Sequence, residues 1–321
     1  MERVLIKERQ SFRHKLGHRI KSARFLLLMI IPAIVYYAIF CYVPMYGVLI
    51  AFTDFAPKKG IMWSVVHNWI GFANFQTIFN LPGFWQAFRN TLMIGTIKVV
   101  ISFVSAVFVA LLINELRMRY FKKFAQIVVT FPHFLSWVVV ASLFLLMFSE
   151  HGSINHMINN ATGQTIGFLT DKRFFLTLIF SSDIWKEAGW SSIIYIATMA
   201  GISPDLYEAA DIDGATRLQK IWHITLPGIK ATAILLLIMS VGGVLSAGFD
   251  QIFNLTGSLH NPMVEDVTQI IDTYIYQITF VSHQYREGVT TAMGLFKSVI
   301  GFVLVITTDR IAKACGERGI I

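Results

Sequence analysis

"YEAADIDGATRLQKIWHITLPGIK", residues 207–230, is a polar stretch that separates two long apolar runs. Just before it, Ser203 and Pro204 form a strong helix start, because a serine hydroxyl caps a helix and proline suits its first position. We therefore predict a helix over 205–213 that ends near Gly214, since glycine readily takes the left-handed conformation of a helix stop.

A second short helix is predicted to follow, because Thr216 and Gln219 have the spacing of a capping box. Pro227 stands where that helix must end or bend into the next apolar run. The stretch is thus predicted to form a helix–glycine–helix elbow. Its small Ala209–Ala210 pair would let another surface approach closely; the alternative is an ordinary capped loop with no partner.

The composition of the whole chain points to lipid. Its 321 residues are 55% hydrophobic and only 14% charged, and the mean hydropathy is +0.60. A soluble domain carries about a quarter charged residues. The two cysteines, Cys41 and Cys315, offer neither a disulfide framework nor the ligand spacing of a metal site.

Six apolar runs are long enough to cross a hydrocarbon core about 30 Å thick, which takes about 20 helical residues. They are residues 25–52, 89–113, 124–149, 174–200, 228–252 and 288–309. Pro32 and Pro44 are candidate break points in the first run. The predicted fold is an all-α polytopic membrane protein with six transmembrane helices.

The distribution of positive charge predicts the orientation of these helices. Eighteen Lys and Arg residues lie in 1–24, 114–123, 201–230 and the C-terminal tail, against five in the three loops of the other side. Cytoplasmic loops carry the excess of positive charge, so both termini and the elbow are predicted to be cytoplasmic. The same bias accounts for the net charge of +8 without nucleic acid.

The chain is accordingly divided into four predicted parts. Residues 1–24 form a basic cytoplasmic arm, and residues 25–88 form the first transmembrane helix and an outer aromatic segment, in which a short interfacial helix is expected. Residues 89–309 form the transmembrane core with the cytoplasmic loop 201–230, and residues 310–321 form a cytoplasmic tail.

The elbow resembles the signature of permease subunits of binding-protein-dependent ABC importers, Glu-Ala-Ala, three residues, Gly, nine residues, Ile-x-Leu-Pro. The matching positions are Glu208, Ala209, Ala210, Gly214, Ile224, Leu226 and Pro227. "FCYVPMYGVLIAF" (40–52), "WIGFANF" (69–75), "FRNTL" (88–92) and "TAMGLFKSVIGFVLV" (291–305) are similar to the carbohydrate-uptake branch, above all to permeases for complex oligo- or polysaccharides.

This resemblance implies the fold of a type I ABC importer permease in the bacterial plasma (inner) membrane. The elbow would be a coupling helix on one of two cytoplasmic ATPase subunits. An extracytoplasmic solute-binding protein would deliver an oligosaccharide, and a second homologous permease would complete the pore, with a heterodimer favoured. The chain has no G-x-x-x-x-G-K-[ST] motif, so no cofactor and no enzymatic activity are expected here; ATP and Mg would bind the ATPases.

Lys98, Lys186, Glu187 and Lys297 fall well inside the second, fourth, fourth and sixth predicted spans. Each costs about 2.5–3.5 kcal/mol at a helix centre unless partners or water offset the cost. Consecutive residues point about 100° apart on a helix, so Lys186 and Glu187 are not expected to pair. Glu187 is expected to pair with Lys98 or Lys297 instead.

Two interpretations of these charges stay open. They are structural ion pairs, or they line the solute path together with Trp190 and Ser240. In the second case, three lysines against one glutamate leave a positive surplus that would suit an acidic sugar, unless a partner subunit balances it. The pairs Gly243–Ala247 and Gly242–Ser246 have the small-xxx-small spacing of close helix packing; the alternative is that these small residues form the wall of a solute channel, in which Ser240 donates a hydrogen bond.

Two functions from other classes compete with the importer. A proton-coupled secondary transporter would use Lys98, Lys186 and Glu187 as a relay, and a membrane-embedded enzyme such as a glycosyltransferase would need paired acidic motifs that are missing. The nine histidines are scattered, and no metal site is expected.

Overall fold

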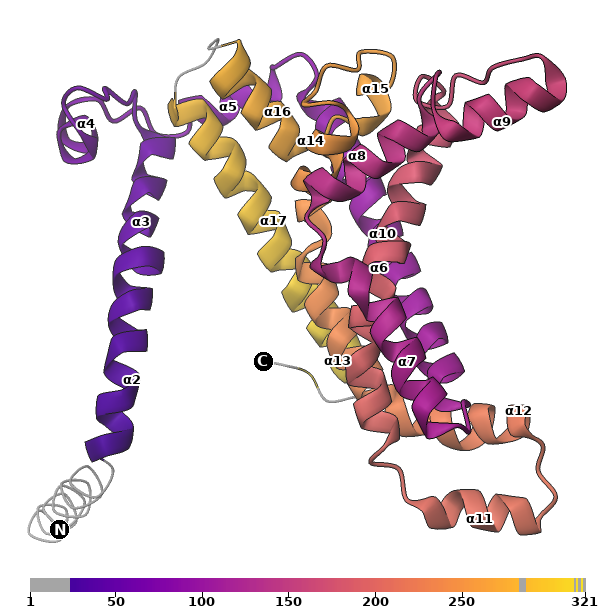
Figure 1. Cartoon of the computed structure of the whole chain (residues 1–321). Helices are drawn as coiled ribbons and strands as arrows, with labels where there is room; N and C mark the ends of the chain where they lie inside the picture. The colour runs from indigo at the N-terminus through magenta and orange to yellow at the C-terminus, as the bar shows by residue number, and fades with distance from the viewer. Residues whose placement is uncertain (1–23, 283–286, 315, 317–318, 320–321) are drawn as a thin grey trace, which may run out of the picture. The chain divides into compact units, whose positions relative to one another are not determined.

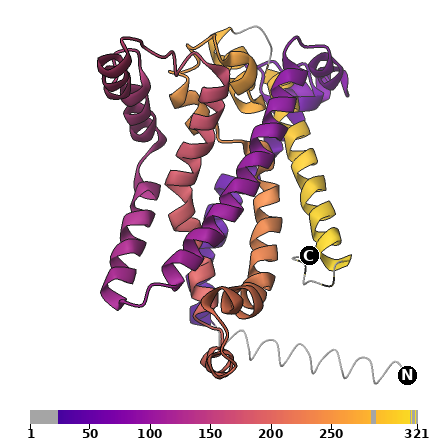
Figure 2. The same cartoon turned by 90° about the vertical axis from the view of Figure 1, so that its right-hand side faces the viewer.

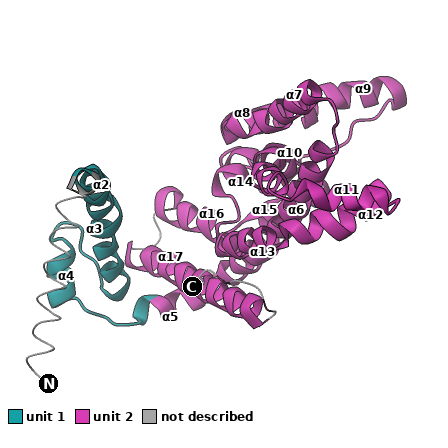
Figure 3. Cartoon of the chain, turned by 90° about the horizontal axis from the view of Figure 1, so that it is seen from below, with its two compact units in different colours: residues 1–74 teal, residues 75–321 magenta. Residues whose placement is uncertain are grey.

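The structure, a computed structural model, describes residues 24–282, 287–314, 316 and 319. It divides into two compact units, residues 1–74 and 75–321 (Figure 3). The predicted basic arm lies outside the described residues except for residue 24, and so do residues 315, 317–318 and 320–321 of the predicted tail. The functional division at residues 24, 88 and 309 remains a prediction.

The first unit contains an apolar helix whose hydrogen-bond pattern changes along its length. Its segments are α2 (Arg24–Tyr37), the π-helical segment Ala38–Tyr42, α3 (Val43–Met45) and the 3₁₀ segment Tyr46–Phe52, and α4 (Ile61–His67) follows. The helix continues through Pro32. The π-helical segment precedes Pro44, because proline has no N–H to pair with the carbonyl four residues before it.

The second unit is built from long helices, shown in Figure 1. Those that form its body are α6 (Phe84–Asn114), α7 (Arg119–Thr130), α8 (Trp137–Phe148), α10 (Lys172–Met199), α13 (Leu226–Gly242) and α17 (Glu287–Ala314). Shorter helices join them, namely α5 (Ala73–Phe79), α9 (Ser153–Thr162), α11 (Pro204–Ile212), α12 (Arg217–Lys220), α14 (Phe249–Leu255), α15 (Glu265–Thr268) and α16 (Ile271–Tyr276), the last followed by the π-helical segment Gln277–Val281.

Five helices in the described residues are long and apolar enough to cross a membrane. Three of the six predicted spans, the first, second and sixth, correspond to them closely, while the third overlaps Trp137–Thr162 and the fifth overlaps Arg217–Gly242. The fourth corresponds to α10, which has 28 residues but carries Asp183, Lys186 and Glu187. The count of six spans and their orientation therefore remain predictions.

The third predicted span, 124–149, is not one continuous helix. It consists of α7, the 3₁₀ segment Phe131–Phe134 and α8. Pro132 lies in the 3₁₀ segment, and the hydroxyl of Ser136 accepts a hydrogen bond from the Val139 N–H at 3.4 Å, which caps a new helix. A proline followed by a capping serine thus breaks a run that hydropathy alone makes continuous.

The fifth predicted span, 228–252, is also broken. Helix α13 ends at Gly242, a 3₁₀ segment covers Val244–Ser246, and α14 begins at Phe249. The residues between the two helices are called the turn 243–248 below. Gly243 and Ala247 therefore do not share a face of one helix, so the prediction of a small-xxx-small helix face here is wrong.

Two of the long helices, α6 and α10, pack along each other at the centre of the unit. Buried side chains of both helices belong to two apolar clusters. One lies around Ile94, Phe175 and Ile252, and the other lies around Ala106, Tyr195 and Ile229. Helices α11 and α12 lie at one end of the unit, and α9 and α14–α16 lie at the other (Figures 1 and 2). The elbow is therefore held at one end of a packed helical body.

Candidate functional site

The elbow has the local structure that its sequence predicts at its first helix. The hydroxyl of Ser203 accepts a hydrogen bond from the Asp205 N–H at 3.4 Å, and α11 starts at Pro204. Helix α11 ends before Gly214, which has φ 74°. A residue with a Cβ rarely adopts this conformation, so glycine fits the stop between the two helices.

The second half of the elbow was predicted to end at Pro227 or to bend into the next apolar run. Thr216 and Gln219 form both hydrogen bonds of the capping box. Helix α12 does not end at Pro227, however, but continues through a π-helical segment, Ile221–Thr225, into α13. The second helix of the elbow is thus the start of a membrane-spanning helix.

Two side-chain contacts tie α11 to this continuous helix. Lys220 Nζ lies 2.6 Å from Asp211 Oδ1, and the hydroxyl of Tyr207 lies 2.9 Å from that of Thr225, which is buried. Helix α11 is therefore linked to α12 and to the π-helical segment, which continue into α13.

The elbow presents an exposed surface that is partly apolar. Of the residues in the resemblance, Glu208, Ala209, Gly214 and Pro227 are exposed, and Ala210, Ile224 and Leu226 are half-buried. Four large apolar side chains, which the sequence analysis overlooked, are also exposed: Leu206, Ile212, Leu218 and Trp222. Ile212 is the most exposed of the four, at 87%. The sequence feature that could have revealed these four residues is that they are large and apolar within or next to a polar stretch.

A cavity of about 350 Å³ lies between α6, α10, α13 and the turn 243–248. Lys98, Glu187 and Ser240, three of the predicted path residues, line it. A neighbouring cavity of about 280 Å³ shares Ser240 and is also lined by Trp190. The structure therefore brings four of the six predicted path residues to two adjoining cavities, while Lys186 and Lys297 line neither.

Lys98 is not paired with Glu187, which corrects the prediction. Its Nζ lies 3.3 Å from Oδ1 of Asp183, whose other oxygen accepts a hydrogen bond from the Ser102 hydroxyl at 3.1 Å. Nζ also donates to Oε1 of Gln251. The sequence analysis overlooked Asp183 and Gln251, although an aspartate one turn before Glu187 in an apolar span was a usable signal.

Glu187 is held by two other residues. Its Oε2 lies 2.7 Å from Nδ1 of His133, and its Oε1 lies 3.1 Å from Nζ of Lys186. Lys186 Nζ also donates to the His133 carbonyl at 2.7 Å. The prediction that the consecutive residues do not pair is wrong, because the long lysine side chain turns back toward its neighbour.

Lys297 is the third lysine with an acidic partner. Its Nζ lies 2.6 Å and 2.7 Å from the two carboxylate oxygens of Asp272 on α16. Together with Asp183 and Glu187, Asp272 balances the three lysines. The predicted positive surplus is therefore absent from these ionisable groups, and a charge preference of the cavity does not follow from them.

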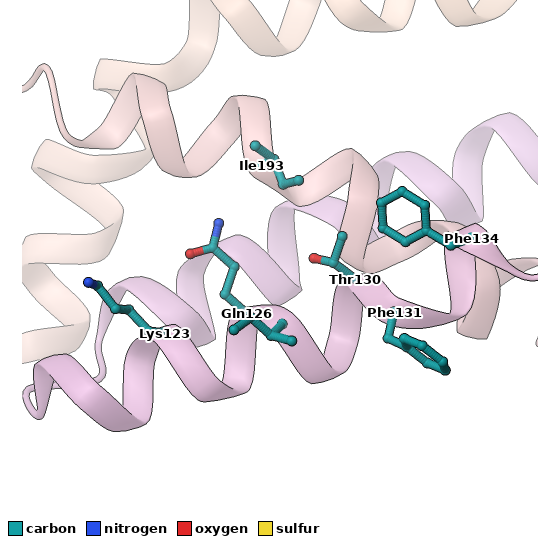
Figure 4. Close-up of a pocket in the computed structure, with 7 residues that line it drawn as sticks. Lys123, Gln126, Thr130, Phe131, Phe134 and Ile193 are labelled. Carbon is teal, nitrogen blue, oxygen red and sulfur yellow. The ribbon is translucent and has the colours of Figure 1, made fainter.

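A separate groove of about 380 Å³ runs along α7 and the 3₁₀ segment beside α10 (Figure 4). Lys123 and Gln126 line one part, and Phe131 and Phe134 line the other. The hydroxyl of Thr130 is buried there and has no hydrogen-bond partner among the described residues.

Across the described part of the chain, no group of three or more His, Cys, Asp or Glu side chains is arranged to hold a metal ion.

Comparison with known proteins gives consistent results. Residues 102–316 match the family described as "Binding-protein-dependent transport system inner membrane component". The polygalacturonan/rhamnogalacturonan transport system permease protein YteP of Bacillus subtilis (strain 168) is 40% identical over 309 residues, or 96% of this chain and 94% of that protein.

Two crystal structures contain a similar chain. One is a bacterial ABC transporter involved in the import of the acidic polysaccharide alginate, with a TM-score of 0.81 and 35% identity over 94% of this chain and 99% of that chain. The other is the bacterial alginate ABC transporter in complex with alginate pentasaccharide-bound periplasmic protein, with a TM-score of 0.82 and 34% identity over the same shares.

Proposed function

The chain belongs to the family of binding-protein-dependent transport system inner membrane components, and from this premise we propose that it carries an oligosaccharide across the membrane. It is a multi-pass permease subunit of an ABC importer in the bacterial plasma (inner) membrane, and ATP hydrolysis belongs to separate subunits. Family membership leaves the proton-coupled alternative without support.

The proposed substrate is an oligosaccharide that contains uronic acid units. The supporting observation is that the similar proteins are named for polygalacturonan, rhamnogalacturonan and the acidic polysaccharide alginate. The ionisable groups in the helices do not add to this argument, because Lys98, Lys186 and Lys297 each have an acidic partner. Selection for the acid is therefore assigned to the solute-binding protein.

The elbow is proposed to be the coupling site for a cytoplasmic ATPase. The proposed contact residues are Glu208, Ala209, Ala210, Gly214, Ile224, Leu226 and Pro227, with the exposed Leu206 and Ile212 added. What supports this is that Lys220–Asp211 and Tyr207–Thr225 link α11 to the helix that continues as α13. ATP and Mg would bind the two ATPases, and the second permease is proposed to be a different, homologous chain.

The proposed orientation places the elbow and both termini in the cytoplasm, with six spans. Helix α10 counts as a span because its Asp183, Lys186 and Glu187 are all paired within the helical body, which lowers the cost of burying them. The junction of α6 and α7, whose loop contributes to the positive excess, lies at the same end of the unit as α11 and α12 (Figure 1).

The proposed solute path runs through the two adjoining cavities. Lys98, Glu187, Ser240 and Trp190 line them and supply a cation, a carboxylate, a hydroxyl and an aromatic face. These are the groups that bind sugar hydroxyls and ring faces. Lys186 is assigned a supporting role, because it holds Glu187 from behind.

The decisive experiment measures ATPase activity of the reconstituted complex with its solute-binding protein. Galacturonate oligosaccharides should stimulate hydrolysis several-fold, and neutral galactose oligosaccharides of equal length should stimulate it less. Stimulation by neutral sugars alone would overturn the uronate proposal, and no stimulation by any saccharide would overturn the carbohydrate proposal. Uptake that needs a proton gradient and no ATPase would favour the secondary transporter.

A further inference from the structure

The turn 243–248 holds a residue in an unfavourable backbone conformation at the wall of the cavity. Ala247 has φ 42°, in the left-handed region that residues with a Cβ seldom adopt. Such a conformation persists only where its surroundings hold it, and such residues gather at sites that bind ligands or move. The contacts that hold Ala247 therefore bear on how the cavity works.

Ala247 packs in the apolar cluster around Ile94 and Ile252, and its carbonyl oxygen is bound by Lys98 on α6. Lys98 Nζ donates a hydrogen bond to the Ala247 carbonyl oxygen at 3.1 Å and another to Oε1 of Gln251, and it pairs with Asp183 at 3.3 Å. A Cβ added at Gly248 would lie 2.5 Å from the same nitrogen, so a side chain there would push the ammonium group away.

Gln251 fixes this arrangement from the start of α14. It is fully buried, and its Nε2 donates to the Ile179 carbonyl at 2.7 Å and to the Ser182 hydroxyl at 2.9 Å, both on α10. The amide is thereby oriented with Oε1 toward Lys98. One ammonium group thus joins α6, α10, the turn and α14; we call Lys98, Asp183, Gln251 and the Ala247 carbonyl the Lys98 network.

The turn rests directly on α6 as well. A Cβ added at Gly95, one turn before Lys98, would lie 1.8 Å from the Val244 carbonyl oxygen, so only glycine permits this approach. The turn also lines the cavity, and Lys98 is the single cation among the described residues around it. A change in the partners of Lys98 would therefore change the wall of the cavity.

We propose that Lys98 is a positioning residue through which a sugar in the cavity controls the turn 243–248. The proposal rests on the proposed function, that this cavity carries the sugar. A sugar hydroxyl or carboxylate oxygen is an acceptor of the same kind as the Ala247 carbonyl and can replace it at the ammonium group. Ala247 then loses the contact that supports its left-handed conformation, and the turn moves.

A buried cysteine at Val244 would report this movement, because Val244 is only 6% exposed. We would replace Cys41 and Cys315 with serine, introduce Val244→Cys, and measure the rate of thiol labelling in membranes that contain the whole complex. The test variant is Lys98→Met/Asp183→Leu, which removes both charges and leaves no unpaired ion. The matched control is Lys297→Met/Asp272→Leu, an ion pair that does not touch the turn.

Labelling should become about tenfold faster in the test variant, the scale expected for loss of a charge-assisted hydrogen bond, and should stay unchanged in the control. Lys98→Arg keeps the charge and the donors and should label at the original rate. If the test variant fails to insert, Lys98→Gln/Asp183→Asn takes its place, because it also removes both charges and keeps polar side chains at both positions. An unchanged rate, or an equal rise in the control, would overturn the proposal.

The link to sugar is tested by adding the solute-binding protein loaded with a galacturonate trisaccharide. The labelling rate should rise in the original complex and should not respond in the test variant. If the sugar has no effect but removal of the Lys98 pair still speeds labelling, the assignment of this cavity to the sugar fails while the hold on the turn stands. If uptake of the sugar is normal and the labelling rate changes neither with the sugar nor in the test variant, the proposed role of Lys98 is wrong while the proposed function stands.

Discussion

His133 and Glu187 are in direct contact, with 2.7 Å between the imidazole Nδ1 and the carboxylate Oε2. The same imidazole ring stacks on Trp190, with 4.4 Å between the ring centroids. His133 belongs to the 3₁₀ segment that breaks the third span, and its two partners lie one turn apart on α10. The 3₁₀ segment between α7 and α8 thus contacts α10 at Glu187 and Trp190, which line the cavities.

We predict that Glu187→Ala destabilises the chain strongly. The side chain of Lys186 is only 7% exposed and would lose its carboxylate partner, which costs roughly 3 kcal/mol for a buried ion pair. Thermal unfolding of the detergent-solubilised chain should show a clearly lower midpoint. Lys172→Ala breaks an ion pair with Asp266 that is half exposed, and it should cost about 1 kcal/mol or less. Shifts of equal size would contradict this account.

We predict that Gly214→Pro abolishes uptake but leaves membrane insertion intact. Gly214 has φ 74°, whereas proline fixes φ near −65°, so the elbow cannot keep its shape. Gly163→Pro is the matched control, because Gly163 has φ 71° in the same kind of helix stop after α9, at the other end of the unit. Uptake measured in cells should be lost only in the Gly214→Pro variant. Equal loss in both variants would contradict a specific role of the elbow in uptake.

We predict that the exposed face of α11 binds the ATPase. Glu208→Lys should abolish uptake, because it reverses the charge offered to a basic residue of the ATPase. Ile212→Asp places a charge on a side chain that is 87% exposed, and the amount of ATPase that copurifies should fall about tenfold, as for a hot-spot residue of an interface. Met157→Asp, on α9 at the other end, alters a side chain that is 71% exposed and should change neither quantity. Normal copurification with Ile212→Asp would exclude this face as the contact.

The elbow was predictable because its signals act over a few residues. Ser203 caps a helix that starts at the next residue, Gly214 ends it, and Thr216 and Gln219 bond each other three positions apart. Such contacts depend on local spacing alone. The exposure of Ile212 was not predictable in this way, because a helix face is exposed or buried only by the rest of the fold.

Two of the three lysine ion pairs were not predictable because they join separate helices, and the pair of the neighbours Lys186 and Glu187 depends on a side-chain conformation that sequence does not give. Lys98 meets Asp183, and Lys297 meets Asp272, only after the helices have packed. The break in the fifth span is similar, since the residues 243–248 read as one apolar run and their turn depends on the bond from Lys98. Hydropathy locates a span, but it does not choose the partner of a charge inside it.

We predict that Lys297→Ala reduces uptake of acidic and neutral sugars by the same factor. Lys297 contacts both oxygens of Asp272 at 2.6 Å and 2.7 Å and lines neither cavity, so its charge is already balanced and does not face the sugar. Its loss leaves Asp272, 24% exposed at its side chain, without a cation and disturbs the contact of α16 with α17. Uptake of galacturonate trisaccharide and of a neutral galactose trisaccharide would be measured for the variant and the original chain.

The double variant Lys297→Ala/Asp272→Ala supplies the control. It removes both charges, so no uncompensated carboxylate is left near the helices, and uptake of both sugars should recover together. A loss confined to the acidic sugar in Lys297→Ala, and not repaired by the second substitution, would mean that this lysine attracts the sugar carboxylates after all. In that event, the ion pair with Asp272 would not cancel the electrostatic attraction between Lys297 and the sugar carboxylates.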